Sequence, residues 1–230
     1  MTAPAPGIRR RGRVGLLNVL SAPAVPTAAV LLLHGGRSEG LEPPPRAGLP
    51  ALRMRPFAAA LSRALADRNV LVATVRYRHR GWNGVRADAA RDAEAALAEV
   101  VRTVGAVPVA LVGHSMGARA ALRAAGHPLV PGVVGLAPWC PPGEPVEHLA
   151  GRRIHLLHDE ADRVTSARET WEFVRRARAA GAHAEGVPMR RGGHAMLRGA
   201  ADWQRRATEL VVGLLDAPPS DGRSGEHGPI

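Results

Sequence analysis

The sequence contains a serine between two glycines at the end of an apolar run, Gly113-His114-Ser115-Met116-Gly117. The preceding residues VALV are typical of a buried strand, and the following residues ARAAL are typical of a helix. A G-x-S-x-G pentapeptide at such a junction indicates a nucleophile elbow, a strained turn that lifts the serine hydroxyl above the edge of a sheet. Free backbone N–H groups at the start of the helix favour negative charge there. The pattern predicts nucleophilic catalysis by Ser115; a purely structural turn is the alternative.

A nucleophilic serine needs a base, and the base needs a carboxylate that holds it in the correct tautomer. Of the ten histidines, His194 fits best, because it follows a predicted strand, lies in the loop RGGHAM and precedes the last predicted helix. Other histidines have simpler interpretations. His114 is the variable position of the elbow, His155 lies inside a predicted strand, and His227 lies near the C-terminus.

The candidate acid lies in HDEADRV, which follows another predicted strand and offers three carboxylates. Catalytic groups of open α/β sheets gather beyond the carboxyl ends of the strands. We select Asp162, because Asp159 and Glu160 leave the strand too early to reach a histidine in the next loop. Those two are expected to form the turn or face solvent, and Asp159 is the second choice for the acid.

An acyl-transfer site also needs an oxyanion hole, in which backbone N–H groups bind the oxygen of the tetrahedral intermediate. The N–H of Met116 is one expected donor. The loop His34-Gly35-Gly36-Arg37 follows the run VLLL and supplies the other, from Gly36 or, as a fallback, from Gly35. A phosphate-binding loop is the alternative, but the segment has neither G-x-G-x-x-G spacing nor a following Lys.

Apolar runs alternate with helical patterns along the chain, which predicts an α/β fold with a mostly parallel central sheet and helices on both faces. The predicted strands are Val14 to Leu20, Ala28 to Leu33, Val70 to Tyr77, Val109 to Val112, Val130 to Leu136, Ile154 to Leu157 and His183 to Met189. The predicted helices are Pro56 to Arg68, Asp88 to Val104, a helix capped by Ser166 and Glu169 that ends at Gly181, and Ala201 to Leu215. We expect a basic flexible N-terminus over 1–13, one domain over 14–216 and a disordered tail over 217–230.

The order Ser115, Asp162, His194 resembles the triad order of the α/β-hydrolase family, and the likeness runs from about Val14 to Leu215. The stretch LLHDEADRVT resembles the family's acid loop, in which a Gly often stands at the position of Asp159. The segments LRMRPFAAAL, RYRHRGWNG and GLAPWCPPGEP resemble those of small bacterial members. The resemblance implies hydrolysis of an ester or thioester through an acyl-enzyme. Acyl transfer or perhydrolysis at the same triad, and a non-catalytic binding scaffold, are the alternatives.

Many members of this family carry a helical lid after the strand that here ends near Leu136. Only the short Pro-rich piece Cys140 to Gly151 follows it here, which predicts an open, lidless site for small or flexible acyl substrates. The loop Arg37 to Leu52 is expected to form part of the rim. The predicted pocket residues are Gly35, Arg37, Trp82, Trp139, Cys140 and Met196, with ordinary core packing as the alternative for the last four.

The formal charge of +11 would ordinarily suggest a polyanionic partner. All the basic residues are Arg, however, and they are scattered among Ala, Gly and Pro, so we expect neither a nucleic acid nor a membrane partner. The single cysteine excludes an internal disulfide and is compatible with a cytoplasmic location, although the segment from Ile8 to Ala24 faintly resembles a secretory signal. We expect no cofactor and no metal, and a small acyl compound as the ligand.

Overall fold

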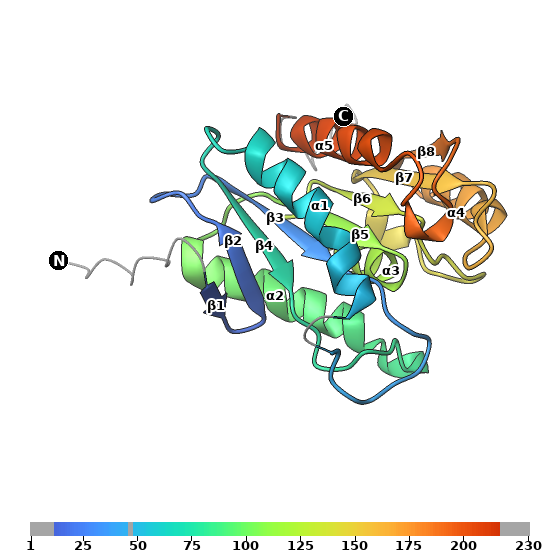
Figure 1. The fold of residues 1–230 in the computed structure, drawn as a ribbon, viewed down its shortest axis with the longest axis horizontal. Helices are drawn as coiled ribbons and strands as arrows, with labels where there is room; N and C mark the ends of the chain where they lie inside the picture. The colour runs from blue at the N-terminus through green and yellow to red at the C-terminus, as the bar shows by residue number, and fades with distance from the viewer. Residues whose placement is uncertain (1–11, 46–47, 217–230) are drawn as a thin grey trace, which may run out of the picture.

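The computed structural model describes residues 12–45 and 48–216, which form one eight-stranded sheet in the order β1-β2-β4-β3-β5-β6-β7-β8 (Figure 1). Strand β2 pairs antiparallel with β1 and with β4, and all other pairs are parallel. The strands are β1 (Gly12–Val14), β2 (Leu17–Ser21), β3 (Ala28–Leu33), β4 (Val70–Val75), β5 (Val109–His114), β6 (Gly132–Leu136), β7 (Arg153–Asp159) and β8 (His183–Met189). The parallel strands all end at the same edge, where the loops that carry the candidate site residues meet.

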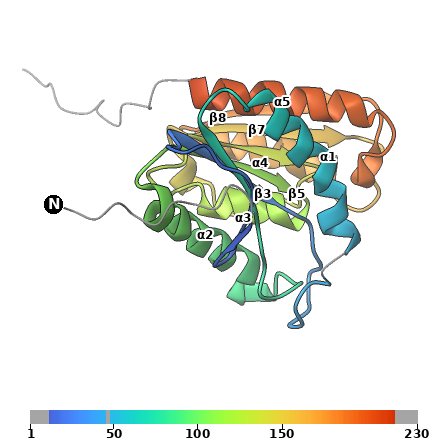
Figure 2. The ribbon, with the colours of Figure 1, turned by 60° about the vertical axis from the view of Figure 1, so that its left-hand side comes forward.

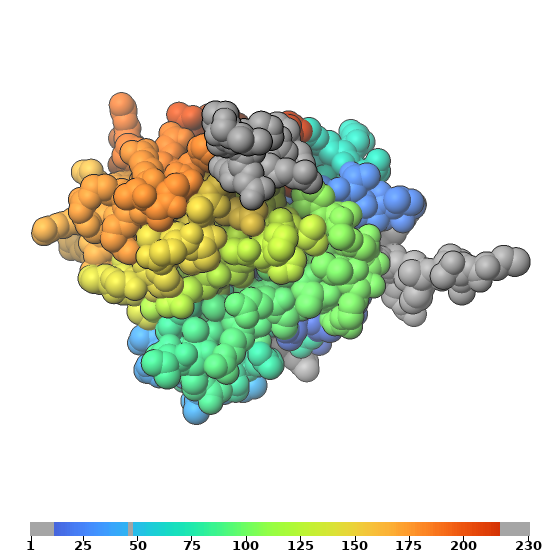
Figure 3. Space-filling view, turned by 180° about the vertical axis from the view of Figure 1, so that it is seen from behind, coloured from blue at the N-terminus to red at the C-terminus, as the bar shows by residue number. Residues whose placement is uncertain are grey.

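Helices cover both faces of this sheet. Helices α1 (Leu49–Ala64) and α5 (Ala200–Asp216) pack on one face, and α2 (Asp88–Val104), α3 (Met116–Ala124) and α4 (Ala167–Ala179) cover the other (Figures 1 and 2). Seen from behind, this second face runs from α2 in green through α3 to α4 in orange (Figure 3). The α/β architecture with a mostly parallel sheet is therefore as predicted.

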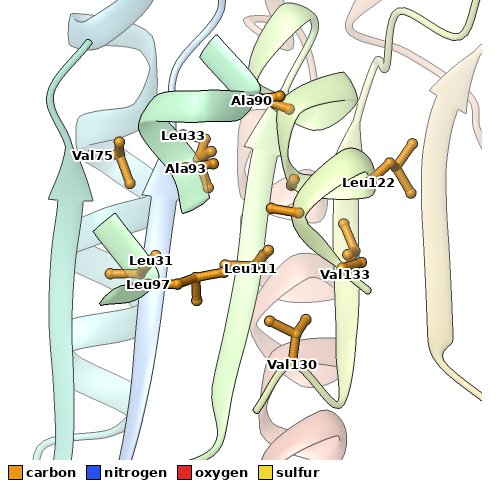
Figure 4. Close-up of a cluster of buried hydrophobic side chains, with 14 of the residues drawn as sticks. Leu31, Leu33, Val75, Ala90, Ala93, Leu97, Leu111, Leu122, Val130 and Val133 are labelled. Atoms are coloured by element: carbon orange, nitrogen blue, oxygen red, sulfur yellow. The ribbon is translucent and has the colours of Figure 1, made fainter. Parts of the chain in front are cut away.

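The alternation of side chains along the central strands divides the core into two layers. Leu31, Leu33 and Leu111 face α2 and α3, where they pack against Ala93 and Leu97 (Figure 4). The intervening residues of the same strands face α1 and α5, and include Val30, Leu32, Ala110 and Val112. Because β3 and β5 are buried on both faces, their sequences are continuous apolar runs.

The first predicted strand is wrong in detail. Val14 to Leu20 does not form one strand but a hairpin, in which β1 and β2 are separated by a turn with Gly15 at a φ of +51°. The apolar residues on both sides of this glycine conceal the turn in the sequence. Gly12 and Arg13, assigned above to the flexible N-terminus, belong to β1, whereas the rest of 1–13 and the tail 217–230 lie outside the described residues.

The predicted start of α1 at Pro56 is also wrong. The helix begins at Leu49, with Pro50 in its first turn, and Pro56 lies exposed inside it. A proline inside a helix removes one hydrogen bond and costs about 3 kcal/mol. Burial of Met54, Phe57 and Leu61 against the sheet offsets this cost. The rim loop therefore ends at residue 48 rather than at Leu52.

Two other features bear on function. The connection between β6 and β7 contains one short 3-10 turn, Glu147–Leu149, and no helical lid. Among the described residues, no helix is long and apolar enough to cross a membrane.

Candidate active site

Ser115 occupies a sharp turn between β5 and α3. Its φ of 55° and ψ of −118° are sparsely populated for a residue with a side chain, so the surrounding structure must hold the turn in place. The two flanking glycines permit it. A Cβ at Gly113 would lie 2.4 Å from the Cα of Ala118, and a Cβ at Gly117 would lie 2.3 Å from the carbonyl oxygen of Leu33. The pentapeptide therefore allows close backbone approach on both sides of the serine.

His194 and Asp162 lie side by side at the same edge of the sheet. The Nδ1 of His194 lies 2.9 Å from the Oδ2 of Asp162, although the two residues are 32 positions apart. His194 lies in a 3-10 turn after β8, and Asp162 lies in the loop between β7 and α4. The Asp162 side chain is fully buried, whereas the His194 side chain is 15% exposed. The histidine thus has one ring nitrogen directed at a buried carboxylate.

Several donors surround the Asp162 carboxylate. Its Oδ1 accepts from the backbone N–H groups of Val164 and Thr165, at 2.7 and 3.1 Å. Its Oδ2 lies 2.9 Å from the Thr165 hydroxyl and 3.2 Å from the Nε2 of His158. Burial by itself raises the pKa of this carboxyl, but the hydrogen bonds from His158, His194 and the backbone outweigh burial and hold the pKa well below its usual range. Asp162 is therefore an ionised acceptor.

His114 connects the elbow to the loop that carries His194. Its Nε2 donates to the carbonyl oxygen of His194 at 2.9 Å, and the centroids of the two rings lie 4.9 Å apart. Burial, together with the charge of His194, lowers the pKa of His114 to about 3, so its ring is neutral at physiological pH. Within residues 12–45 and 48–216, no hydrogen bond joins the Ser115 hydroxyl to His194. Ser115 nevertheless follows His114 in the chain, and His194 contacts His114, so both are neighbours of that histidine.

The loop after β3 lies against the elbow. A Cβ at Gly35 would lie 3.4 Å from the Cβ of Ser115, and a Cβ at Gly36 would lie 2.3 Å from the Cε of Met116. In the described part of the chain, the N–H groups of Gly36 and Met116 donate to no other group. The loop after β3 therefore contacts the elbow, and these two backbone donors are not used within the fold.

Asp159 does not face solvent, contrary to one of the two roles expected for it. It ends β7 and is only 4% exposed, and its Oδ2 accepts from the N–H of Gly193 at 2.7 Å. Its Oδ1 accepts from the N–H of Ala161 at 3.0 Å, so the expected role in the turn is present. Asp159 thus joins the acid loop to the residue before His194 but does not contact the imidazole of His194. Glu160 is exposed, as expected.

Comparison with known proteins identifies the family of this chain. A family model described as "Alpha/beta hydrolase family" matches residues 30–225. The chain belongs to the α/β-hydrolase family. A search of curated proteins finds no match.

Solved structures of several hydrolases and esterases share this fold. A serine hydrolase homologue from Coxiella burnetii is 17% identical with a TM-score of 0.63, and the match covers 91% of this chain and 98% of that chain. A serine hydrolase without a lid from Xanthomonas campestris is 18% identical with a TM-score of 0.59, over 95% and 99% of the two chains. A butyrate-bound esterase from Thermogutta terrifontis is 18% identical with a TM-score of 0.62, over 86% and 87%.

The predicted pocket residues of this α/β-hydrolase differ in accessibility. Arg37 is exposed and Trp139 is half-buried, whereas the other three large side chains, Trp82, Cys140 and Met196, are each 2% exposed. Trp82 and Trp139 hold the guanidinium of Arg119 between them, at 3.9 and 4.4 Å from the ring centroids. Burial raises the pKa of the Cys140 thiol above its usual range, which makes this cysteine unreactive. Trp82, Cys140 and Met196 all belong to the hydrophobic core clusters, and their place in a substrate pocket stays a prediction.

Sequence reasoning did not assign His158, Thr165 or His114 to the site. All three contact His194 or Asp162, but His114 is 80 residues from its partner, and no local spacing reveals such a contact. The sequence offered one indication of a role for His158. It is a polar residue near the end of a buried strand, four residues before Asp162. Among the residues described, no group of three or more His, Cys, Asp or Glu has an arrangement that could hold a metal ion.

Proposed function

We propose that this α/β-hydrolase is a serine hydrolase that cleaves a carboxylic ester or thioester, with Ser115 as nucleophile, His194 as base and Asp162 as the orienting acid. The observation that carries the proposal is the strained Ser115 turn at the same sheet edge as the His194–Asp162 pair, whose atoms lie 2.9 Å apart. An ionised Asp162 requires a proton on Nδ1 of His194, which leaves Nε2 as the lone-pair nitrogen.

Each group has a defined step in this mechanism. The Ser115 oxygen attacks the acyl carbonyl while Nε2 of His194 takes the hydroxyl proton, and the same proton then passes to the leaving group. The N–H groups of Gly36 and Met116 donate to the oxyanion of the tetrahedral intermediate. Water, activated by His194, then attacks the acyl-enzyme and releases the acid and free Ser115.

This proposal needs the hydroxyl and Nε2 to meet when substrate binds. Catalytic hydrogen bonds are often long without substrate and tighten in the complex. His114 supports such an approach, because it directly precedes Ser115 in the chain and its ring donates a hydrogen bond to the backbone carbonyl of His194. The Gly192 and Gly193 φ values of +138° and +53° give the His194 loop a backbone that residues with side chains rarely adopt.

Hydrolysis of p-nitrophenyl acetate, butyrate and octanoate tests the proposal. Ser115→Ala and His194→Ala are expected to lower kcat/KM by at least about 10³-fold for every ester that the native protein cleaves. Ser62→Ala on α1 is the matched control, because Ser62 lies away from the elbow, and it should retain native activity. Native activity in Ser115→Ala would overturn the assignment of the nucleophile.

A further inference from the structure

Asp162 contacts two imidazoles, of which the proposed mechanism uses one. The second belongs to His158, the penultimate residue of β7, whose side chain is fully buried. Its Nε2 lies 3.2 Å from the Oδ2 of Asp162, and its Nδ1 lies 2.8 Å from the Oγ1 of Thr170 on α4. Trp171 packs edge-on against the ring, with centroids 6.2 Å apart. Both ring nitrogens of His158 are therefore engaged in a closed environment.

The partners determine the tautomer of a neutral His158. Ionised Asp162 can only accept, so the contact at 3.2 Å requires a proton on Nε2. Nδ1 is then an acceptor, and the Thr170 hydroxyl donates to it at 2.8 Å rather than to the Ser166 carbonyl at 3.3 Å. Oδ2 of Asp162 consequently accepts from two imidazoles and from the Thr165 hydroxyl.

We infer that His158 is a positioning residue, a second imidazole donor that fixes the Asp162 carboxylate and shares its negative charge with His194. The inference rests on the proposed function, in which Asp162 orients His194. Sharing the charge weakens the attraction between the carboxylate and a protonated His194. Loss of the His158 donor would also free the Asp162 carboxylate to leave the position in which it orients His194.

The charged and titratable groups around this pair come from the loop after β8, from the end of β5 and from β7 itself. His194 contacts Asp162 from the loop after β8, and His114 approaches His194 from the end of β5. Asp159, next to His158 in β7, directs its carboxylate to the N–H of Gly193 and not to either imidazole. Asp162 is thus the carboxylate through which His158 acts on His194.

Two substitutions of His158 distinguish the effect of its Nε2 donor from the effect of the rest of the imidazole ring. In His158→Gln the amide N–H₂ can replace Nε2 and still donate to Asp162. In His158→Asn the shorter amide can replace Nδ1 towards Thr170 but loses the donor to Asp162. We expect His158→Asn to lower kcat by about tenfold at unchanged KM, because the Asp162 carboxylate loses a donor that fixes it. His158→Gln should stay within about threefold of the native kcat.

His148→Asn is the matched control, since the ring of His148 donates to the Leu122 carbonyl and not to Asp162, and it should retain native kcat. Native kcat in a folded His158→Asn variant would overturn the inference, as would equal losses of kcat in the Gln and Asn variants.

The tautomer provides a test that needs no activity. ¹⁵N NMR of the native protein with labelled histidine should show His158 protonated at Nε2 and unprotonated at Nδ1, and the His158→Asn spectrum assigns the signal. Protonation at Nδ1 alone would overturn the inference. If the native protein hydrolyses no ester while Nε2 of His158 carries the proton, the proposed function fails and the donor contact to Asp162 stands.

Discussion

Replacement of Asp162 by Asn perturbs the site most informatively, because the two side chains have nearly the same shape. The carboxylate accepts from two backbone N–H groups at Oδ1 and from His194, His158 and Thr165 at Oδ2. An amide presents one acceptor oxygen and one donor nitrogen. If the oxygen faces the backbone, the amide N–H₂ confronts two imidazole N–H groups. If it faces the imidazoles, the N–H₂ confronts the two backbone donors.

The magnitude follows from these contacts. In the first orientation His194 must move its proton from Nδ1 to Nε2, which removes the lone pair that would accept the Ser115 proton. In a Ser-His-Asp triad, this change of tautomer costs about 10⁴-fold in kcat, which corresponds to about 5.4 kcal/mol in the activation barrier. In either orientation two donors lose their acceptor, at about 1–3 kcal/mol each, so we also expect a lower free energy of unfolding.

Kinetics of Asp162→Asn and Asp159→Asn on the best p-nitrophenyl ester, with urea unfolding of both, test the reasoning. Asp159→Asn should cost only about tenfold in kcat, since an amide oxygen can still accept from Gly193 at the Oδ2 position. A folded Asp162→Asn variant within tenfold of native kcat would refute the reasoning, and a larger loss in Asp159→Asn would move the acid to Asp159.

Two further predictions concern stability. Glu144, 1% exposed, pairs with Arg119 and Arg123, so Glu144→Gln should leave buried positive charge unpaired and lower the free energy of unfolding by about 3 kcal/mol, a fall in Tm of roughly 6–12 °C by calorimetry. The folded-state pKa of Asp162 lies below its ordinary value of 3.8, so its contribution to stability is present above that pH and is lost as the pH falls through and below it. Urea unfolding between pH 6 and pH 3 should therefore show a smaller loss of stability in Asp162→Asn than in the native protein, and equal losses would contradict this pKa direction.

Much of the architecture could be predicted because its signals are local. The bounds of β3 (Ala28–Leu33), β8 (His183–Met189) and α2 (Asp88–Val104) agree with the sequence prediction. β3 is a continuous apolar run and α2 is a continuous helical pattern. The errors arise where a local rule meets tertiary packing. Gly15 turns the chain inside an apolar run, and Pro56 remains within a helix whose neighbouring residues are buried.

The site divides in the same way. Ser115 lies in a pentapeptide whose backbone demands can be read from its glycines, and the structure contains the strained turn that they permit. The contacts of His114, His158 and Asp159 could not be predicted, because each depends on how loops from different strands meet. The roles of Ser115, Asp162, His194, Gly36 and Met116 are proposals for experiment.

The most direct test of the central claim is the location of a covalent adduct. The native protein, treated with a fluorophosphonate and digested, should carry one phosphonyl group on Ser115 by tandem mass spectrometry, and His194→Ala should react far more slowly. An adduct on another serine, or equally fast labelling of Ser115→Ala, would contradict the account.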